Sequence, residues 1–315
     1  MLDQLSEGAL QFMCDSCTNA SQLPTIAIIG PGRVGTSIGI LAAQAGYSVA
    51  AVGGRRKADT LAAARRIGKD VCACDIAEAG QLARIILLCL PDDAIEQVCE
   101  KLALENKFTK GAIVVHCSGA LSSDILSPAR KYCQCYVASM HPLQTFPTVD
   151  AAVKIMKGTY CFYEGDERAI TVVKHFATDI GWRPIQISST SKTLYHAAAV
   201  MACNYLVALM DSALVLAEKA GIDRTIAWSA IEPLVATTLN NITEMGTINS
   251  LTGPIARGDV KTVRRHLQEL VLTPGHLASV YRTMGLYTVE IAVRRGTITV
   301  TKAAELRDLL ADVER

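Results

Sequence analysis

The sequence predicts an α/β fold in which a doubly wound parallel sheet is followed by an all-helical C-terminal domain. Short β-branched runs alternate with helical patterns from residue 23 to residue 188, and a glycine-rich turn directly follows the first run. Only helical patterns occur beyond residue 188. Regular alternation of strands and helices implies parallel strands joined by right-handed crossovers. We therefore expect an N-terminal extension, 1–22, a sheet domain, 23–188, and a helical domain, 189–315.

The predicted strands are short apolar runs, and several are continuous, as in strands that are buried on both faces. In chain order they are Thr25–Ile29, Ser48–Val52, Ile85–Leu90, Ile113–His116, Tyr160–Tyr163 and Arg183–Ile187. The predicted helices between them are Arg33–Gly46, Lys57–Gly68, Asp93–Ala103, Ser123–Lys131 and Glu167–Ile180. Two cysteine pairs alternate as strand residues do, Cys72 with Cys74 and Cys133 with Cys135.

Charge and composition exclude several classes of protein. The 315 residues are 50% hydrophobic, and Lys+Arg 31 against Asp+Glu 30 leaves a net charge of +1, which provides no basic surface for nucleic acid. The 11 cysteines are odd in number and scattered, as in a reduced cytoplasmic protein where free cysteine packs as a small hydrophobe. Cys14 and Cys17 form a CxxC without a second pair at zinc-site spacing, so we expect no metal site.

One segment, Leu194–Leu216, is apolar enough to be considered as a membrane helix. It contains His196, Asn204 and Asp211, which would be costly at the centre of a bilayer. We therefore expect a long buried helix of a soluble protein. The start of the chain is acidic where a signal peptide would be basic, so no targeting segment is expected.

A GxGxxG motif, Gly30-Pro31-Gly32-Arg33-Val34-Gly35, lies between the first predicted strand and its helix. In this setting Gly30 permits the tight turn, Gly32 lets a pyrophosphate approach the backbone, and Gly35 lets the helix pack on the strand. The phosphates would lie at the helix N-terminus, where free N–H groups favour anions. Arg33 and Val34 belong to the same expected cofactor-binding turn.

The end of the second predicted strand favours NADP. A carboxylate usually binds the ribose hydroxyls of NAD at this position, but here two glycines precede Arg55 and Arg56. The glycines would leave room for a 2′-phosphate, which two guanidinium groups can bind. The alternative is a solvated basic helix start, which is unfavourable without an anion.

Further candidates follow the next predicted strands, whose carboxyl ends face the ligand crevice in such sheets. Leu90 and Pro91 could contact the cofactor, or Pro91 could serve only to start a helix. Ser118 could reach substrate or nicotinamide, or could only form a turn. His141 lies in a segment with two prolines that we expect to be a rigid loop, where a histidine is either structural or functional.

The helical domain adds polar candidates. Lys192 and His196 are four residues apart and share one helix face among apolar residues. Because buried polar groups need partners, we expect both to be functional. Asn204 is either a substrate contact or an interhelical hydrogen-bonding group, and Arg257 either binds a substrate carboxylate or pairs with Asp259.

Several motifs together resemble one family of Rossmann-like oxidoreductases with a helical C-terminal domain of unassigned function, which is similar to deazaflavin-coenzyme-dependent NADP oxidoreductases. They are Gly30–Gly35, Leu90–Asp93, His116–Gly119, His141–Phe146, Tyr195–Ala198 and Leu251–Asp259. More distantly the chain is similar to β-hydroxyacid dehydrogenases, pyrroline-carboxylate reductases and ketopantoate reductases. The hydroxyacid dehydrogenases carry Lys-x-x-x-Asn where this chain has Lys192-x-x-x-His196, so the resemblance implies a different substrate contact.

These observations predict an NADP-dependent oxidoreductase that transfers hydride between nicotinamide and a carbonyl or imine carbon of a small carboxylate substrate. Lys192 or His196 would supply the proton, His141 and Ser118 would bind substrate, and no nucleic acid or membrane partner is expected. A non-catalytic NADP(H)-binding sensor is the alternative. The helical domain is apolar on more than one face, so we expect a homodimer.

Overall fold

The computed structural model describes residues 23–311 and divides into two compact units, 1–200 and 201–315. The predicted extension, 1–22, with Cys14 and Cys17, lies outside the described residues. The boundary predicted at residue 188 lies within the first unit, because the helix that follows it contacts the sheet through Lys192 and Tyr195.

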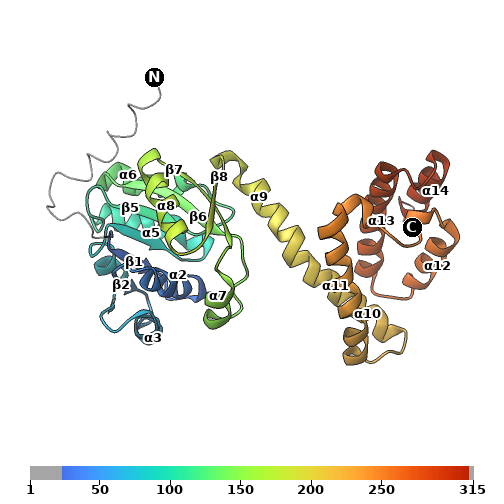
Figure 1. The fold of residues 1–315 in the computed structure, drawn as a ribbon, viewed down its shortest axis with the longest axis horizontal. Helices are drawn as coiled ribbons and strands as arrows, with labels where there is room; N and C mark the ends of the chain where they lie inside the picture. The colour runs from blue at the N-terminus through green and yellow to red at the C-terminus, as the bar shows by residue number, and fades with distance from the viewer. Residues whose placement is uncertain (1–22, 312–315) are drawn as a thin grey trace, which may run out of the picture. The chain divides into compact units, whose positions relative to one another are not determined.

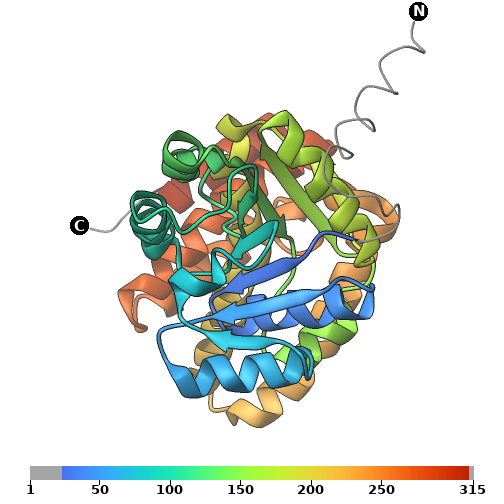
Figure 2. The same cartoon turned by 90° about the vertical axis from the view of Figure 1, so that its left-hand side faces the viewer.

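The first unit is built on an eight-stranded sheet (Figures 1 and 2). Its strands are β1 Ile26–Ile29, β2 Val49–Gly53, β3 Cys72–Cys74, β4 Ile85–Leu88, β5 Ile113–His116, β6 Tyr136–Pro142, β7 Tyr160–Gly165 and β8 Arg183–Gln186. Their order in the sheet is β3-β2-β1-β4-β5-β6-β7-β8. The chain winds from β1 to one edge and then returns past β1 to build the other side, so the predicted doubly wound sheet is confirmed.

The antiparallel pairing of β6 with β7 departs from the predicted all-parallel sheet, while the other neighbouring pairs are parallel. The β6–β7 pairing extends one residue beyond Pro142, where the Leu143 N–H donates to the Tyr160 carbonyl at 2.9 Å. The short helix α7, Val149–Ile155, packs against α2, Arg33–Gln44, and the chain then returns along β6 in the opposite direction.

The strand β6, Tyr136–Pro142, was not predicted; the sequence suggested strand residues only at the preceding cysteine pair. Cys133 ends a helix and Cys135 precedes β6, so the prediction of a strand at this pair is wrong, whereas Cys72 and Cys74 do lie in β3. His141 lies within β6 instead of in the predicted loop, because its backbone pairs with Phe162 of β7. A residue on a central strand is held more firmly than one in a loop, which matters for the site below.

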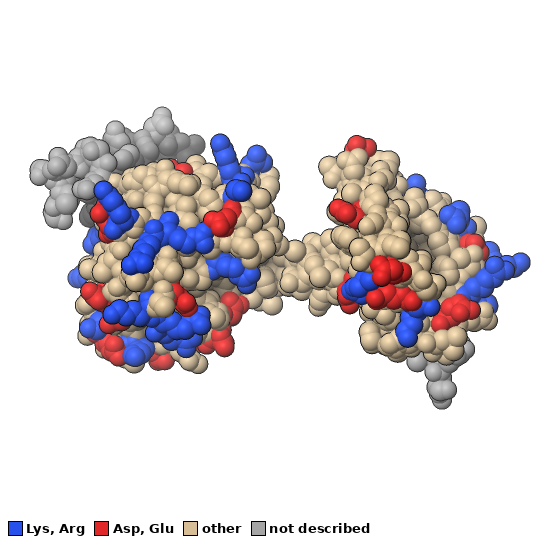
Figure 3. Space-filling view, turned by 90° about the horizontal axis from the view of Figure 1, so that it is seen from below, with Lys and Arg blue, Asp and Glu red and all other residues tan. Residues whose placement is uncertain are grey.

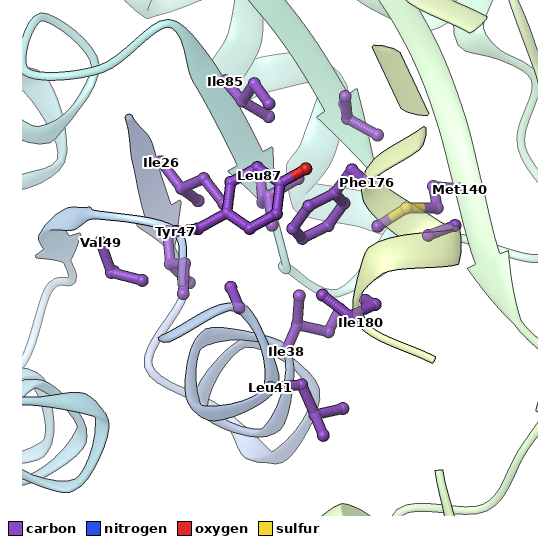
Figure 4. Close-up of a cluster of buried hydrophobic side chains, with 14 of the residues drawn as sticks. Ile26, Ile38, Leu41, Tyr47, Val49, Ile85, Leu87, Met140, Phe176 and Ile180 are labelled. Atoms are coloured by element: carbon purple, nitrogen blue, oxygen red, sulfur yellow. The ribbon is translucent and has the colours of Figure 1, made fainter. Parts of the chain in front are cut away.

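Helices cover both faces of the sheet (Figure 2). Besides α2 and α7 they are α3 Lys57–Ile67, α4 Ile76–Ala79, α5 Asp92–Leu104, η1 Ser123–Leu126, α6 Ser127–Cys133 and α8 Glu167–Asp179. Because side chains alternate along a strand, Ile26 and Ile28 pack with α2, α3 and α8, whereas Ala27 and Ile29 pack with α4, α5 and α6. On the first face Tyr47 meets the ring of Phe176 edge-on at 5.2 Å between centroids (Figure 4).

Among the residues that the structure describes, the second unit contains helices joined by turns and no strand. Its helices are α10 Tyr205–Lys219, α11 Arg224–Asn249, η4 Ile255–Arg257, α12 Val260–Leu270, α13 Gly275–Arg295 and α14 Val300–Ala311. Its core is formed where α12, α13 and α14 meet, around Val263, Val289 and Leu306. By contrast, α10 and α11 each bury a single residue, Leu214 and Ala227.

The helical stretch from Ser189 to Lys219 consists of four successive elements: η2 (Ser189–Ser191), α9 (Lys192–Ala199), the π-helical turn η3 (Val200–Asn204) and α10. Of the described chain, this stretch alone is long and apolar enough, by length and composition only, to cross a membrane. The mean hydropathy of its most apolar window is 1.8. The prediction that it is buried is wrong for the single chain: only 6% of its most apolar window is buried, and Val207 is 69% exposed. In Figure 3 the face shown over the middle of this stretch carries no charged side chains.

Candidate functional site

A cleft of about 840 Å³ lies at the carboxyl ends of the first strands. It is lined by the turns that follow β1, β2 and β4: Gly30 to Gly32, Gly54 to Arg56 and Cys89 to Pro91. The order of the sheet reverses beside β1, and ligands bind at such switch points in open α/β sheets. The predicted cofactor residues Leu90 and Pro91 therefore lie in the same cleft as the glycine turn.

The glycine turn has the backbone conformation that its sequence requires. Gly30 has φ +111°, and a Cβ there would lie 2.2 Å from the carbonyl oxygen of Cys89. A Cβ on Gly35 would lie 2.9 Å from Ile28 Cγ2, so this glycine lets α2 pack closely on β1. Gly32 has open space where a Cβ would be, and no side chain caps the N-terminus of α2. These residues fit a pyrophosphate, because the helix N-terminus offers free N–H groups to an anion.

Two arginines line the cleft after β2. Arg55 and Arg56 are both part of its wall, and Arg56 pairs with Asp59 at 2.6 Å. Gly54 also lines the cleft, and the expectation that the two glycines leave room for a 2′-phosphate stays a prediction. A Cβ on Gly53 would lie 2.7 Å from Ala79, and one on Gly54 would lie 2.4 Å from Thr60 Oγ1. Both glycines let the end of β2 pack closely, which holds the arginines beside the glycine turn.

A second group of polar residues surrounds Lys192, which is only 1% exposed. Its ammonium donates hydrogen bonds to the Ser118 carbonyl at 2.8 Å and to the Ser139 hydroxyl. Burial lowers the pKa of Lys192 to about 8, although the charge of Glu164 acts in the opposite direction. An amine with such a pKa is well suited to exchange a proton near neutral pH.

His141 is part of the same group. Its Nδ1 lies 2.8 Å from the hydroxyl of Tyr195. Burial, and then the positive charge of Lys192, lower the pKa of His141 to about 4, so its ring is neutral at physiological pH. The same two causes lower the pKa of His116 to about 3, and its Nδ1 accepts the Ser118 N–H at 3.1 Å.

His196 lies beside His141, with 5.7 Å between the ring centroids. Its Nδ1 is buried and has no hydrogen-bond partner among the described residues. A Cβ on Gly119 would lie 2.5 Å from this atom and 2.8 Å from the Nε2 of His141, so both rings pack against the bare backbone of Gly119. The predicted residues Ser118, His141, Lys192 and His196 therefore form one group within the first unit.

The hydroxyl of Ser118 has the geometry of a turn. Its Oγ accepts the N–H groups of Ala120 and Leu121, each at 3.1 Å. Its carbonyl accepts the Lys192 ammonium. Its O–H proton is still free to donate, so a role in binding substrate stays a prediction.

Two family models match the chain. A Rossmann-like domain matches residues 14–142, and a domain of unknown function, DUF2520, matches residues 159–288. The chain contains a Rossmann-like domain followed by a DUF2520 domain. The resemblance inferred from the sequence is confirmed. The Rossmann-like match contains the glycine turn, Arg55 and His141, and the DUF2520 match contains Lys192 and His196.

Solved structures share this fold at low sequence identity. A protein from Bacteroides fragilis, named as a candidate NADP oxidoreductase, is 20% identical with a TM-score of 0.68, covering 85% of this chain and 98% of that chain. A protein from Thermotoga maritima is 25% identical with a TM-score of 0.64, covering 86% and 99%. An imine reductase from Pseudomonas sp. is 18% identical with a TM-score of 0.62, covering 91% and 99%. A search of curated proteins finds no match.

Two predicted residues of the DUF2520 domain lie in the second unit. Asn204 ends the π-helical turn η3, and Arg257 ends η4. Asp259 accepts the N–H of Thr262 at 3.1 Å and its hydroxyl at 2.7 Å, at the start of α12. The roles of Asn204 and Arg257 in substrate binding stay predictions.

Three residues beside the predicted site of this DUF2520 protein were not identified from sequence: Tyr195, Gly119 and Ser139. Tyr195 follows Lys192 by three residues and so shares its helix face, a signal that the sequence did contain. Gly119 is part of the motif His116–Gly119, but neither it nor Ser139 was predicted to contact the site, because their contacts join segments that are far apart in the chain.

Proposed function

We propose that this protein is an NADP-dependent oxidoreductase that transfers hydride between nicotinamide and a carbonyl or imine carbon of a small carboxylate substrate. The observation that carries the proposal is the closeness of the cleft to the polar group around Lys192. Cys89 lines the cleft, and its Sγ lies 3.7 Å from the Sγ of Cys117, the residue before Ser118. A dinucleotide extending from the glycine turn along the strand ends would lead toward that group. The NADP oxidoreductase and imine reductase among the similar structures support the same class of reaction.

Lys192 and His141 would have different roles in the proposed reaction. Bound NADPH would supply the hydride. Lys192 would supply the proton, because its ammonium has a pKa of about 8 and two of its three N–H groups are used by Ser118 and Ser139. The neutral ring of His141, with a pKa of about 4, would bind substrate without delivering a proton.

A fluorescence titration of NADPH and NADH against the purified protein tests the proposal first. We expect tight NADPH binding and weak NADH binding, followed by oxidation of NADPH when small keto acids and cyclic imines are added. Binding without turnover on any of these substrates would support the non-catalytic sensor instead. If neither dinucleotide binds, the glycine turn serves packing alone and the proposal is wrong.

The apolar face of α10 and α11 supports a second proposal, that two copies of the chain associate through it. On these two neighbouring helices Tyr205, Val207, Ile226 and Leu234 are between 61% and 69% exposed. A monomeric soluble protein rarely exposes so many large apolar side chains together. A lipid covering is less favourable, because Asp211 and Arg224 form an ion pair between these helices.

Light scattering of the purified protein should give twice the mass of the chain. The double substitution Val207→Glu/Leu234→Glu should convert the dimer to a monomer, since it places charges within the apolar face. Leu104→Glu, at an exposed position of α5 in the first unit, is the matched control and should leave the dimer intact. A wild-type monomer in aqueous buffer, or one that binds only to lipid vesicles, would contradict this proposal.

A further inference from the structure

Three buried polar side chains form a row across three neighbouring strands. His116 on β5 is paired with Ser139 on β6, and Ser139 is paired with Glu164 on β7. Their exposed fractions are 0%, 0% and 4%. Paired residues point to the same face of a sheet, and in an antiparallel pair such as Ser139 and Glu164 their Cβ atoms lie about 4.5–5.5 Å apart. The ammonium of Lys192 donates to Ser139, so a buried cation and a buried carboxylate are neighbours of the same serine.

Ser123, at the start of η1, holds the carboxylate of Glu164. Its N–H donates to one oxygen at 2.8 Å, and its hydroxyl donates to the other at 2.7 Å. A buried carboxylate needs such partners, because burial removes water from the charge. A glutamine could keep both contacts, since its oxygen would accept the N–H and its amide would donate to the hydroxyl oxygen. The contacts with Ser123 therefore do not explain why this position carries a charge.

His116 contributes no charge to the row. Its Nδ1 accepts the N–H of Ser118, so the ring proton is on Nε2, which donates to the Ser122 carbonyl at 3.1 Å. Both nitrogens thus hold the loop whose Ser118 carbonyl accepts the Lys192 ammonium. Burial lowers the pKa of His116 to about 3, so the ring stays neutral. Glu164 is the charged member of the row.

The other titratable groups around the Lys192 ammonium do not replace the charge of Glu164. They are Cys117 after β5, His141 on β6, Cys161 on β7, Asp92 at the start of α5 and His196 on α9. A histidine can only be neutral or positive. Thiols are mostly protonated at neutral pH, and burial raises the pKa of Cys161 further. Asp92 is exposed, so solvent screens its charge.

We propose that Glu164 is a positioning residue that keeps the buried Lys192 in its ammonium form, with Ser139 between the two charges. The attraction offsets only part of the cost of burying the cation, since the pKa of Lys192 still falls to about 8. Without Glu164, burial would lower this pKa further, and less of the lysine would hold a proton at neutral pH. That Lys192 gives this proton to a substrate rests on the proposed function; the pairing of the two charges does not.

Nuclear magnetic resonance of the full-length protein with ¹³C-labelled lysine tests this role without cofactor or substrate. The chemical shift of a lysine ε-carbon follows its protonation, and the Lys192 signal is the one that is lost in Lys192→Met. We expect this signal to titrate near pH 8 in the wild type and about one pH unit lower in Glu164→Gln. Because glutamine can keep both contacts with Ser123, the variant removes the charge alone.

Two further variants separate charge from shape. Glu164→Asp keeps the charge on a shorter side chain and should bring the titration of Lys192 back toward pH 8. Glu167→Gln removes an exposed carboxylate three residues away and should leave the titration unchanged. An unchanged midpoint in Glu164→Gln, or an equally low midpoint in Glu164→Asp, would overturn the proposal.

A double-mutant cycle provides a second measurement. At about pH 6, where Lys192 is charged, Glu164→Gln should lower the folding equilibrium constant about tenfold more in the wild type than in the Lys192→Met background. If Glu164→Gln alone does not fold, adding Lys192→Met should restore folding, because the uncompensated cation is then gone. Equal effects in both backgrounds, or a double variant that stays unfolded, would mean that Glu164 serves packing only.

The pH profile of turnover connects this role to the proposed function. In Glu164→Gln the alkaline fall in NADPH oxidation should begin about one pH unit lower than in the wild type, by the same amount as the Lys192 titration. A profile that stays in place while the titration moves would show that Lys192 is not the proton donor. In that case, or if no NADPH is oxidised at all, the proposed function fails and the pairing of Glu164 with Lys192 stands on the resonance data.

Discussion

Replacing Lys192 by methionine should lower turnover by about 10²-fold or more and leave NADPH affinity nearly unchanged. The ammonium donates to the Ser118 carbonyl and the Ser139 hydroxyl beside the two histidines, whereas the residues that line the cleft at the glycine turn do not include Lys192. Methionine has a similar length and no proton to give. Steady-state kinetics with NADPH, together with the fluorescence titration, separates loss of chemistry from loss of binding. Full activity of the Lys192→Met variant would show that Lys192 is not the proton donor.

The same substitution should stabilise the fold at neutral pH. Burial disfavours the charged form of Lys192 and lowers its pKa from 10.5 to about 8. The ammonium is therefore carried in the folded state at a cost, which methionine removes at the loss of two hydrogen bonds. We expect a gain of about 1–2 kcal/mol in the free energy of unfolding, measured by chemical denaturation. Lys101→Met, at an exposed position of α5, is the control and should change stability little.

The pKa of Lys192 fixes the sign of the pH dependence of the unfolding free energy. Between pH 8 and 10.5 the folded lysine has lost its proton while the unfolded lysine retains one, so unfolding takes up a proton. Stability therefore rises with pH in this window, and below pH 8 the penalty is constant. The difference in unfolding free energy between Lys192→Met and wild type should thus shrink from pH 8 to 10.5. Turnover in the reducing direction should fall above pH 8, as the proton donor is lost.

The fold was predictable where its causes are local. A GxGxxG turn between a strand and a helix is dictated by a few backbone conformations, such as the φ of +111° at Gly30. The apolar runs of buried strands are likewise read from neighbouring residues. The direction of β7 was not predictable, because it depends on how a connection packs against α2, far away in the sequence.

The candidate site was predictable only in part for the same reason. Lys192 and His196 share a helix face, which their spacing indicates directly. Tyr195 meets His141 across 54 positions of the chain, and Gly119 meets His196 across an even longer separation, so no spacing rule relates them. The exposure of α10 in the single chain was not predicted. Its apolar composition indicates that some surface covers this helix face, but it does not indicate whether that surface belongs to the same chain.

The double substitution Arg55→Glu/Arg56→Ala should weaken NADPH binding by about 10²-fold and change NADH binding little. A 2′-phosphate carries about two negative charges, and charge-assisted hydrogen bonds to guanidinium groups are among the strongest that a protein makes. NADH lacks this phosphate, so it loses only a general electrostatic attraction. Because Arg55 and Arg56 line the cleft beside the glycine turn, the change acts on one end of the bound dinucleotide.

Two control variants separate phosphate recognition from other effects of charge. Arg65→Glu reverses an exposed charge on α3 that does not line the cleft, so it should weaken both dinucleotides slightly and equally. Asp59→Asn releases Arg56 from its ion pair at 2.6 Å, so NADPH affinity should be kept or increased. Equal losses of NADPH and NADH in the double variant would mean that the arginines act on the shared pyrophosphate. In that case Asp59, the first acid after β2, would become the better candidate for contacting the ribose, and the preference for NADP would have no structural basis.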